Sequence, residues 1–231
     1  MKGPLNERKT LALSSSEPWQ TKPSDRFVLR WIKVHLSSRV TPHLASVPGI
    51  HPWMITVASS ALGVLAGLFF GLGWAFTAGC FAALAQVLDG VDGQLARLRG
   101  LETSWGAFWD STLDRYADGA MMVGMCAFIA QEMPNISLGI LIPLGTVALL
   151  GCQLISYTTA RAETLGLSLG PPTLASKGTR TSIMILAAWA TVFWKAAPAA
   201  ALIALAGISN TVVVRRLLYV RASGSRARSF K

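Results

Sequence analysis

The chain has 231 residues, of which 52% are hydrophobic and only 14% are charged. Soluble domains usually carry about a quarter of charged residues, so this composition argues against a water-soluble protein. The formal net charge of +10 raises nucleic acid as a partner. However, the basic residues flank apolar segments, which favours anionic lipid headgroups and makes DNA a poor second.

The N-terminal region predicts two segments. Residues 1–22 are polar and lack the apolar core of a signal peptide, so we expect a disordered cytoplasmic tail. Residues 23–40 predict an amphipathic helix, because Arg26, Arg30 and Lys33 recur on one helical stripe. The opposite face is apolar and aromatic, with Phe27, Leu29, Trp31, Ile32 and Leu36. We expect it to lie in the membrane interface rather than to pack, solvated, on a cytoplasmic domain.

Six stretches approach the roughly 20 apolar residues that a membrane-spanning helix needs. They are residues 54–72, 74–96, 107–131, 137–160, 181–196 and 198–214. The prediction is therefore an all-α integral membrane fold of six transmembrane helices. These helices form one domain over residues 50–222, followed by a basic cytoplasmic tail over residues 223–231.

The basic residues predict the orientation of this fold. With six spans both termini lie on one side, and only Lys195 falls near the other side. The remaining basic residues gather with the termini, including Lys2, Arg8, Lys9, Lys22, Arg39, Arg97, Arg99, Arg161, Lys177, Arg180, Arg215 and Arg216. By the positive-inside rule that side is cytoplasmic, so we expect a multi-pass protein of the cell membrane.

The first span carries Gly63, Gly67 and Gly71 at intervals of four residues. Such a stripe lets another helix backbone approach closely. The default expectation is packing within the chain, and dimerisation through this stripe is the alternative.

Aspartates are concentrated between residues 88 and 118. Asp89 and Asp92 align on one face at the end of the second span, and Asp110 and Asp114 align on the third span. A connection of about six residues makes these helices antiparallel neighbours, so the four carboxylates are expected to converge on the cytoplasmic side.

Four neighbouring carboxylates need cations, because like charges so close cannot all ionise alone. Burying each at the bilayer centre would cost about 2.5–3.5 kcal/mol. Hard oxygen ligands indicate magnesium or manganese, and pairs of such ions stabilise phosphoryl transfer. The sequence therefore predicts a two-metal site of Asp89, Asp92, Asp110 and Asp114.

The spacing of these residues resembles a family motif. Asp89-x-x-Asp92-Gly93-x-x-Ala96-Arg97, then eight residues, then Gly106-x-x-x-Asp110-x-x-x-Asp114, is similar at every position to the motif of the CDP-alcohol phosphotransferase family. The resemblance implies six transmembrane helices, an N-terminal interfacial helix, a cytoplasm-facing site and a homodimer.

The resemblance also implies roles for the motif residues. Asp89, Asp92 and Asp110 would hold two Mg²⁺ or Mn²⁺ ions, and Asp114 would contact metal and take the proton of the acceptor hydroxyl. The nucleotide would be bound around Asp92 by small residues and one cation, namely Gly93, Ala96, Arg97 and Gly106. Helix packing is an equal alternative for Gly106.

Outside the motif, one position departs from the family and several resemble it. Trp53 stands where the family usually has asparagine, in Pro52-Trp53-Met54-Ile55-Thr56, which affects a nucleotide-side contact. The segment Ser156–Glu163 and the pair Lys177 and Arg180 resemble family positions. Arg161, Lys177 and Arg180 would then bind an acceptor phosphate, or serve only as cytoplasmic anchors. Asp118 continues the acidic stripe, with Arg161 or Lys177 as candidate partners.

The expected activity is transfer of a phosphoalcohol from a CDP-alcohol to a hydroxyl, with release of CMP. CDP-diacylglycerol is the favoured donor, and inositol phosphate or glycerol phosphate the favoured acceptor, because of the basic residues. The alternative is a soluble donor such as CDP-inositol, since residues 24–41 resemble the N-terminal edge of enzymes that use it. A divalent-cation transporter is a distant alternative, because the acidic residues gather at one membrane edge.

Overall fold

The computed structural model describes residues 27–171, 173 and 175–228, and within them all regular structure is helical. The expected tail over residues 1–22 lies outside the described residues. Six long helices form the body: α4 (Pro52–Gly71), α5 (Ala75–Leu98), α6 (Ser104–Glu132), α7 (Leu138–Thr164), α8 (Lys177–Ala190) and α9 (Ala197–Arg228). Each overlaps one of the six predicted spans, and α9 continues beyond the predicted start of the tail at residue 223.

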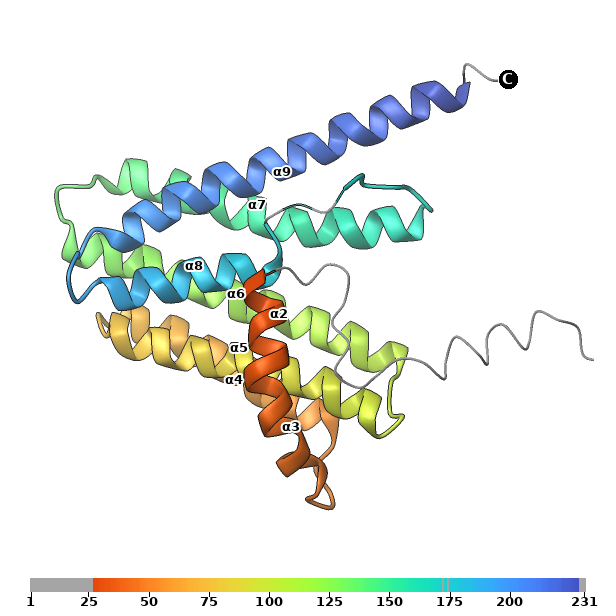
Figure 1. The fold of residues 1–231 in the computed structure, drawn as a ribbon. Coiled ribbons are helices and arrows are strands. Elements are labelled where there is room, and N and C mark those ends of the chain that lie inside the picture. The colour runs from red at the N-terminus through yellow and green to blue at the C-terminus, as the bar shows by residue number, and fades with distance from the viewer. Residues whose placement is uncertain (1–26, 172, 174, 229–231) are drawn as a thin grey trace, which may run out of the picture.

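The long helices run side by side with α4 at the centre of one half of the bundle (Figure 1). It packs along both α5 and α6, while α7 packs along α9 and α8 contacts α5 and α9. The predicted neighbours α5 and α6 make few direct contacts with each other, because α4 packs along both. The short connection between them joins their ends only, which leaves an interhelical space for the site.

Small residues explain the close approach of α4 and α6. A Cβ added at Gly63 would lie 2.7 Å from the Cβ of Ala117, and one at Gly67 would overlap the backbone of Ala120. Gly124 on α6 meets the backbone of Gly67 in the same way. The prediction of packing within the chain is therefore confirmed for this glycine stripe.

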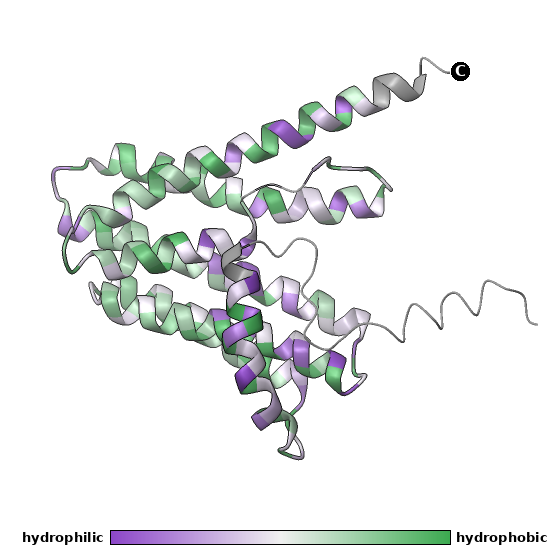
Figure 2. Ribbon diagram, in the orientation of Figure 1, coloured by the Kyte–Doolittle hydropathy of each residue, from purple (hydrophilic) through white to green (hydrophobic). Residues whose placement is uncertain are grey.

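Membrane insertion is indicated by three of the described helices. By length and composition, α4, α7 and residues Ala197–Ser223 of α9 are able to cross a bilayer. In contrast, α5 and α6 carry the acidic residues, and α8 has 14 residues, or about 21 Å at 1.5 Å per residue. Hydrophilic residues gather towards the end of the bundle where the N-terminal segment crosses it (Figure 2).

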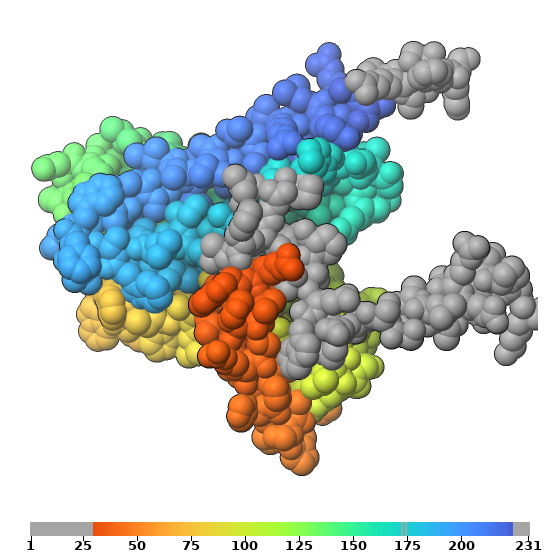
Figure 3. Space-filling view, viewed as in Figure 1, coloured from red at the N-terminus to blue at the C-terminus, as the bar shows by residue number. Residues whose placement is uncertain are grey.

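The predicted N-terminal helix is present in the described residues and continues to Ala45, beyond its predicted end at residue 40. It consists of α2 (Phe27–Ile32), a π-helical turn η1 (Lys33–Ser37) and α3 (Ser38–Ala45). Trp31 and Leu36 are exposed, in keeping with an interfacial face. The segment lies crosswise over the bundle, against α5 and α8 (Figures 1 and 3).

Buried polar contacts hold this segment against α5. The hydroxyl of Ser37 donates to the carbonyl of Val87 at 2.8 Å, and that of Thr41 donates to Oε1 of Gln94 at 2.7 Å. The amide of Gln94 in turn donates to the carbonyl of Lys33 at 2.9 Å. Because these contacts fall on the same turns of α5 as Asp89 and Asp92, the N-terminal segment supports the helix that carries half of the acidic residues.

Candidate metal and nucleotide site

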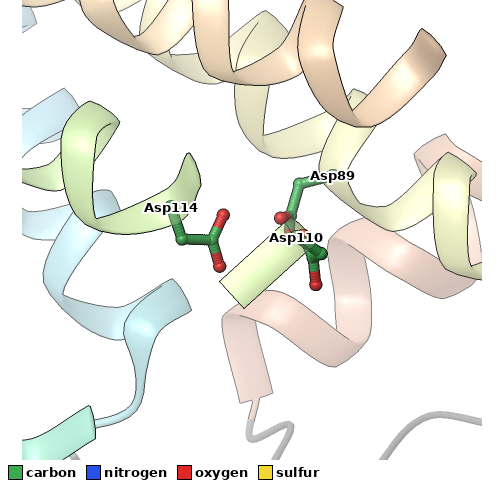
Figure 4. A group of neighbouring side chains, drawn as sticks. All are labelled: Asp89, Asp110 and Asp114. Atoms are coloured by element: carbon green, nitrogen blue, oxygen red, sulfur yellow. The ribbon is translucent and has the colours of Figure 1, made fainter. Parts of the chain in front are cut away.

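Three aspartates from two helices meet between α5 and α6. Asp89 lies in the second half of α5, whereas Asp110 and Asp114 lie one turn apart in the first half of α6. Each offers a carboxylate oxygen, and these oxygens all lie within 4.8 Å of one another. The carboxyl groups face a common space (Figure 4). All three side chains are partly buried, so the cluster remains open to ions.

The chemistry of this cluster fits a divalent metal. Carboxylate oxygens are the hard ligands that Mg²⁺ and Mn²⁺ prefer. Three carboxylates confined to this volume repel one another unless a cation neutralises them. The residues present therefore fit the metal that the sequence predicts.

Asp92, the fourth predicted ligand, lies outside this group of three. Its side chain is buried, and Oδ2 accepts a hydrogen bond of 2.7 Å from the hydroxyl of Thr56 on α4. The backbone N–H of Gly93 donates to Oδ1 at 2.5 Å. Asp92 is within electrostatic range of Asp89 and Asp110. Since each carboxylate oxygen has two lone pairs, these hydrogen bonds leave capacity for a metal.

Lys177 lies directly in the acidic cluster. It is the first residue of α8, and its ammonium donates to Oδ1 of Asp89 at 2.7 Å and to Oδ1 of Asp114 at 2.5 Å. The sequence placed Lys177 among acceptor-binding cations and did not predict this contact. The two partners lie 88 and 63 residues away in the chain, so no local pattern could have found it.

Arg180 forms an ion pair with Asp118, outside the three-aspartate cluster. Its side chain is 4% exposed, Nη2 lies 3.5 Å from Oδ2 of Asp118, and Nη1 donates to the carbonyl of Ala175 at 2.8 Å. This answers the open question about Asp118, whose ion-pair partner is Arg180 rather than Arg161 or Lys177. A guanidinium held in this way is less available for an acceptor phosphate than the sequence implied.

The small residues of the motif border open space. A Cβ at Gly93 would meet only the guanidinium of Arg97, at 3.5 Å or more. A Cβ at Gly106 would meet only the hydroxyl of Thr103, which caps α6 by accepting from the N–H of Gly106. Among the described residues no neighbouring helix comes close enough to require a glycine at either position. The helix-packing alternative for Gly106 therefore has no support. Ala96 and Arg97 are partly buried on the same helix end.

The end of α7 carries a basic group that the sequence only partly identified. Arg161 is exposed there. Arg216 of α9 donates to the hydroxyls of Thr158 and Thr159 at 2.7 and 3.0 Å, and it lies within electrostatic range of Arg180. From the sequence, Arg216 is predicted only as one of the cytoplasmic basic residues. Its signal was its position just beyond the end of the last apolar stretch at residue 214, where a charge near the membrane needs partners.

A small cavity with both polar and apolar lining residues adjoins the cluster. It measures about 40 Å³, which is room for a few water molecules. Its lining includes Asp89, Asp114 and Lys177 of the cluster, the polar residues Ser59, Gln86, Asp118 and Thr181, and apolar residues such as Ala82 and Met121. The cavity lies between α4, α5, α6 and α8, where the separation of α5 from α6 leaves space.

The fold and the site together define an all-helical membrane protein with a carboxylate cluster that fits a divalent metal. Comparison with known proteins is more specific, because the model of the CDP-alcohol phosphatidyltransferase family matches residues 49–216. This chain belongs to that family, as the motif from Asp89 to Asp114 predicted.

Two curated relatives and two crystal structures are informative. The chain is 37% identical over 142 residues to the phosphatidylinositol phosphate synthase of Streptomyces avermitilis, covering 61% of this chain and 57% of the relative. It is 32% identical over 207 residues to the bifunctional IPC transferase and DIPP synthase of Rubrobacter xylanophilus, covering 90% of this chain and 45% of that protein. The chain thus spans about half the length of these curated relatives.

The similar crystal structures are of the phosphatidylinositol phosphate synthase of Mycobacterium tuberculosis. With CDP-DAG bound, it is 30% identical to this chain with a TM-score of 0.70, covering 80% of this chain and 93% of that one. In complex with manganese and citrate, the identity is 30% and the TM-score 0.71, with coverage of 80% and 88%.

Proposed function

We propose that this protein transfers a phosphatidyl group from CDP-diacylglycerol to the hydroxyl of a phosphorylated acceptor, inositol phosphate first and glycerol phosphate second, and releases CMP. The observation that carries the proposal is the convergence of Asp89, Asp110 and Asp114, whose carboxylate oxygens lie within 4.8 Å of one another. Membership of the family and the 37% identity to a phosphatidylinositol phosphate synthase support this choice of donor and acceptor.

The acidic residues would hold two divalent ions. Asp89, Asp110 and Asp114 supply ligands from the cluster, and Asp92 supplies one from its place beside Thr56. When bound, Mg²⁺ or Mn²⁺ would neutralise charge on the phosphates of the donor and of departing CMP. The crystal structure of the mycobacterial relative with manganese supports this choice of metal.

The residues of the chain then have separate tasks. Gly93, Ala96 and Gly106 leave room for the nucleotide, and Arg97 binds its phosphates with a planar guanidinium. Asp114 accepts the proton of the acceptor hydroxyl. The oxygen of that hydroxyl forms a bond to the phosphorus that carries the donor alcohol, and the bond from that phosphorus to CMP breaks. The product is a phosphodiester, and the proton on Asp114 passes to solvent.

The acceptor site is proposed beside the ends of α7, α8 and α9. Arg161 is exposed there, and Lys177, Arg180 and Arg216 bring further positive charge. Because Arg180 is paired with Asp118, Arg161 and Arg216 are the stronger candidates for phosphate. A phosphorylated acceptor fits this charge better than serine or choline does.

We also propose that α4 to α9 all span the membrane, with both termini and the site on the cytoplasmic side, and that the protein is a homodimer. The three apolar helices and the basic residues beside the termini support the topology. The family resemblance supports the dimer. Cysteine labelling from each side and crosslinking in membranes would test the two proposals.

A second candidate function uses a soluble donor such as CDP-inositol. The relative that matches 90% of this chain is a bifunctional IPC transferase and DIPP synthase, and its match is the more extensive of the two. The two functions share the metal site and differ only in the alcohol.

One experiment tests both functions. Purified protein is incubated with Mn²⁺ and either CDP-diacylglycerol or CDP-inositol, together with inositol phosphate, glycerol phosphate, inositol or serine, and CMP release is measured. We expect the fastest release with CDP-diacylglycerol and inositol phosphate. Release only with unphosphorylated acceptors would reject the proposed acceptor class. If no pair of substrates releases CMP, the proposed transferase activity is rejected.

A further inference from the structure

The ammonium of Lys177 bonds to oxygens that belong to the metal cluster. Its Nζ lies 2.7 Å from Oδ1 of Asp89 and 2.5 Å from Oδ1 of Asp114. Asp110 completes the same cluster. A lysine in this place supplies positive charge where the carboxylates otherwise repel one another.

The position of Lys177 in its helix makes this arrangement unusual. It begins α8, and Arg180 follows in the same first turn. The N-terminus of a helix carries a partial positive charge, so basic residues are disfavoured there unless carboxylates face them. The charge of Lys177 at this position is therefore stabilised by Asp89 and Asp114, and the charge of Arg180 is stabilised by Asp118.

A divalent ion competes for the same groups. One ammonium does not neutralise three carboxylates, whereas a divalent ion brings twice the charge to the same oxygens. Once the two ions of the proposed site are bound, the negative charge that attracted the ammonium is neutralised, and repulsion between the cations favours its departure. The adjoining cavity, which Lys177 itself lines, gives its flexible side chain room to move towards Thr181 and Asp118.

We propose that Lys177 is a placeholder cation, which bridges Asp89 and Asp114 while the metal site is empty and leaves them when divalent ions bind. This inference rests on the proposed function only in taking the cluster as a metal site. It makes Lys177 a positioning residue that keeps the two helices in register before metal arrives. It also means that Lys177 raises the metal concentration at which the site fills.

The substitution Lys177→Met separates this role from acceptor binding, because it removes the charge and keeps an unbranched chain. Manganese binding is measured by titration calorimetry without any substrate. We expect Lys177→Met to bind Mn²⁺ about tenfold more tightly than wild type. We also expect it to melt at a lower temperature in EDTA and to gain more from Mn²⁺ than wild type does.

Lys195→Met is the matched control. Lys195 also pairs with a carboxylate, that of Glu132 at 2.6 Å. This ion pair joins the C-terminal end of α6 to the connection between α8 and α9, and it includes no residue of the cluster. Its removal should leave the Kd for Mn²⁺ unchanged. An equal or weaker affinity for Mn²⁺ in Lys177→Met overturns the inference, and CMP release by wild type then still supports the proposed function.

A second measurement uses the wild-type protein, so it does not depend on the folding of a variant. Lysines are acetylated with a small reagent with and without Mn²⁺, and modification is followed by mass spectrometry. The side chain of Lys177 is 32% exposed and within reach. We expect its labelling rate to change at least severalfold with Mn²⁺ while that of Lys195 stays constant. An unchanged rate at saturating Mn²⁺ overturns the inference, and failure of folded wild type to bind Mn²⁺ overturns both proposals.

Discussion

The hydroxyl of Thr56 donates a hydrogen bond of 2.7 Å to the carboxylate of Asp92, and this contact joins α4 to the acidic end of α5. Both residues are buried, so water does not compete freely for the carboxylate. Thr56 thereby sets the direction of the one motif aspartate that stands apart from the cluster. It is one turn beyond Trp53, the residue that departs from the family pattern, which shows that the start of α4 still serves the site.

Replacing Thr56 with valine tests this contact. Valine keeps the shape of threonine and removes the donor, and a hydrogen bond to a charged group contributes about 1.5–3 kcal/mol. We expect Thr56→Val to lower kcat/KM for CMP release about tenfold or more. Thr56→Ser, which keeps the hydroxyl, should retain most of the activity. Equal losses in both variants would show that packing of the methyl group, and not the hydrogen bond, matters.

The aspartates of α6 give the most direct test of the proposed reaction. Asp114→Asn removes the proton acceptor, and general base catalysis typically contributes about 10²–10⁴-fold. Asp110→Asn removes a ligand and should reduce metal-dependent CMP release by several orders of magnitude. Glu132→Gln is the control, because Glu132 lies at the other end of α6 and pairs with Lys195. If either cluster variant kept near-normal turnover, the role assigned to that aspartate would be wrong.

Local periodicity explains what the sequence predicted well. Helical spacing fixes which residues share a face, so the positions of Asp89, Asp110 and Asp114 at one end of two helices followed from their intervals. Helical spacing also located the N-terminal amphipathic helix, and the length of the apolar stretches located the six long helices. Pro42, a residue that usually ends or kinks a helix, lies inside α3, and the segment continues to Ala45 beyond the predicted end at residue 40.

Tertiary arrangement explains what the sequence did not predict. A short connection between α5 and α6 indicated antiparallel neighbours, but nothing local showed that α4 would pack along both of them. The partners of Lys177 and Asp118 depend on where α8 begins against α5 and α6. Hydropathy alone supports three spans, because α5 and α6 carry the charges of the site itself.

The buried pair of Asp118 and Arg180 should be needed for stability. Asp118→Asn leaves a guanidinium that is 4% exposed without its carboxylate, and breaking a buried pair costs about 3–5 kcal/mol. We expect a clearly lower melting temperature, with partial recovery when Arg180→Met is added. The exposed pair of Glu132 and Lys195 is the control, since double removal there should change stability by about 1 kcal/mol or less. A double variant whose loss of stability equals the sum of the losses in Asp118→Asn and Arg180→Met would show that the two residues are not coupled.

The contact between the backbones of Gly67 and Gly124 limits the size of the side chain that α6 can carry where it crosses α4. A Cβ at Gly124 would overlap the carbonyl of Gly67, whereas a Cβ at Gly119 would meet nothing within 4 Å. Gly124→Ala must push the helices apart, and overpacking of this kind costs about 1–3 kcal/mol. Gly119→Ala should be neutral or stabilising by up to about 1 kcal/mol, because alanine favours a helix. Melting temperatures in detergent that fall for Gly124→Ala and hold for Gly119→Ala would confirm the contact, and the opposite order would contradict the packing of α4 on α6.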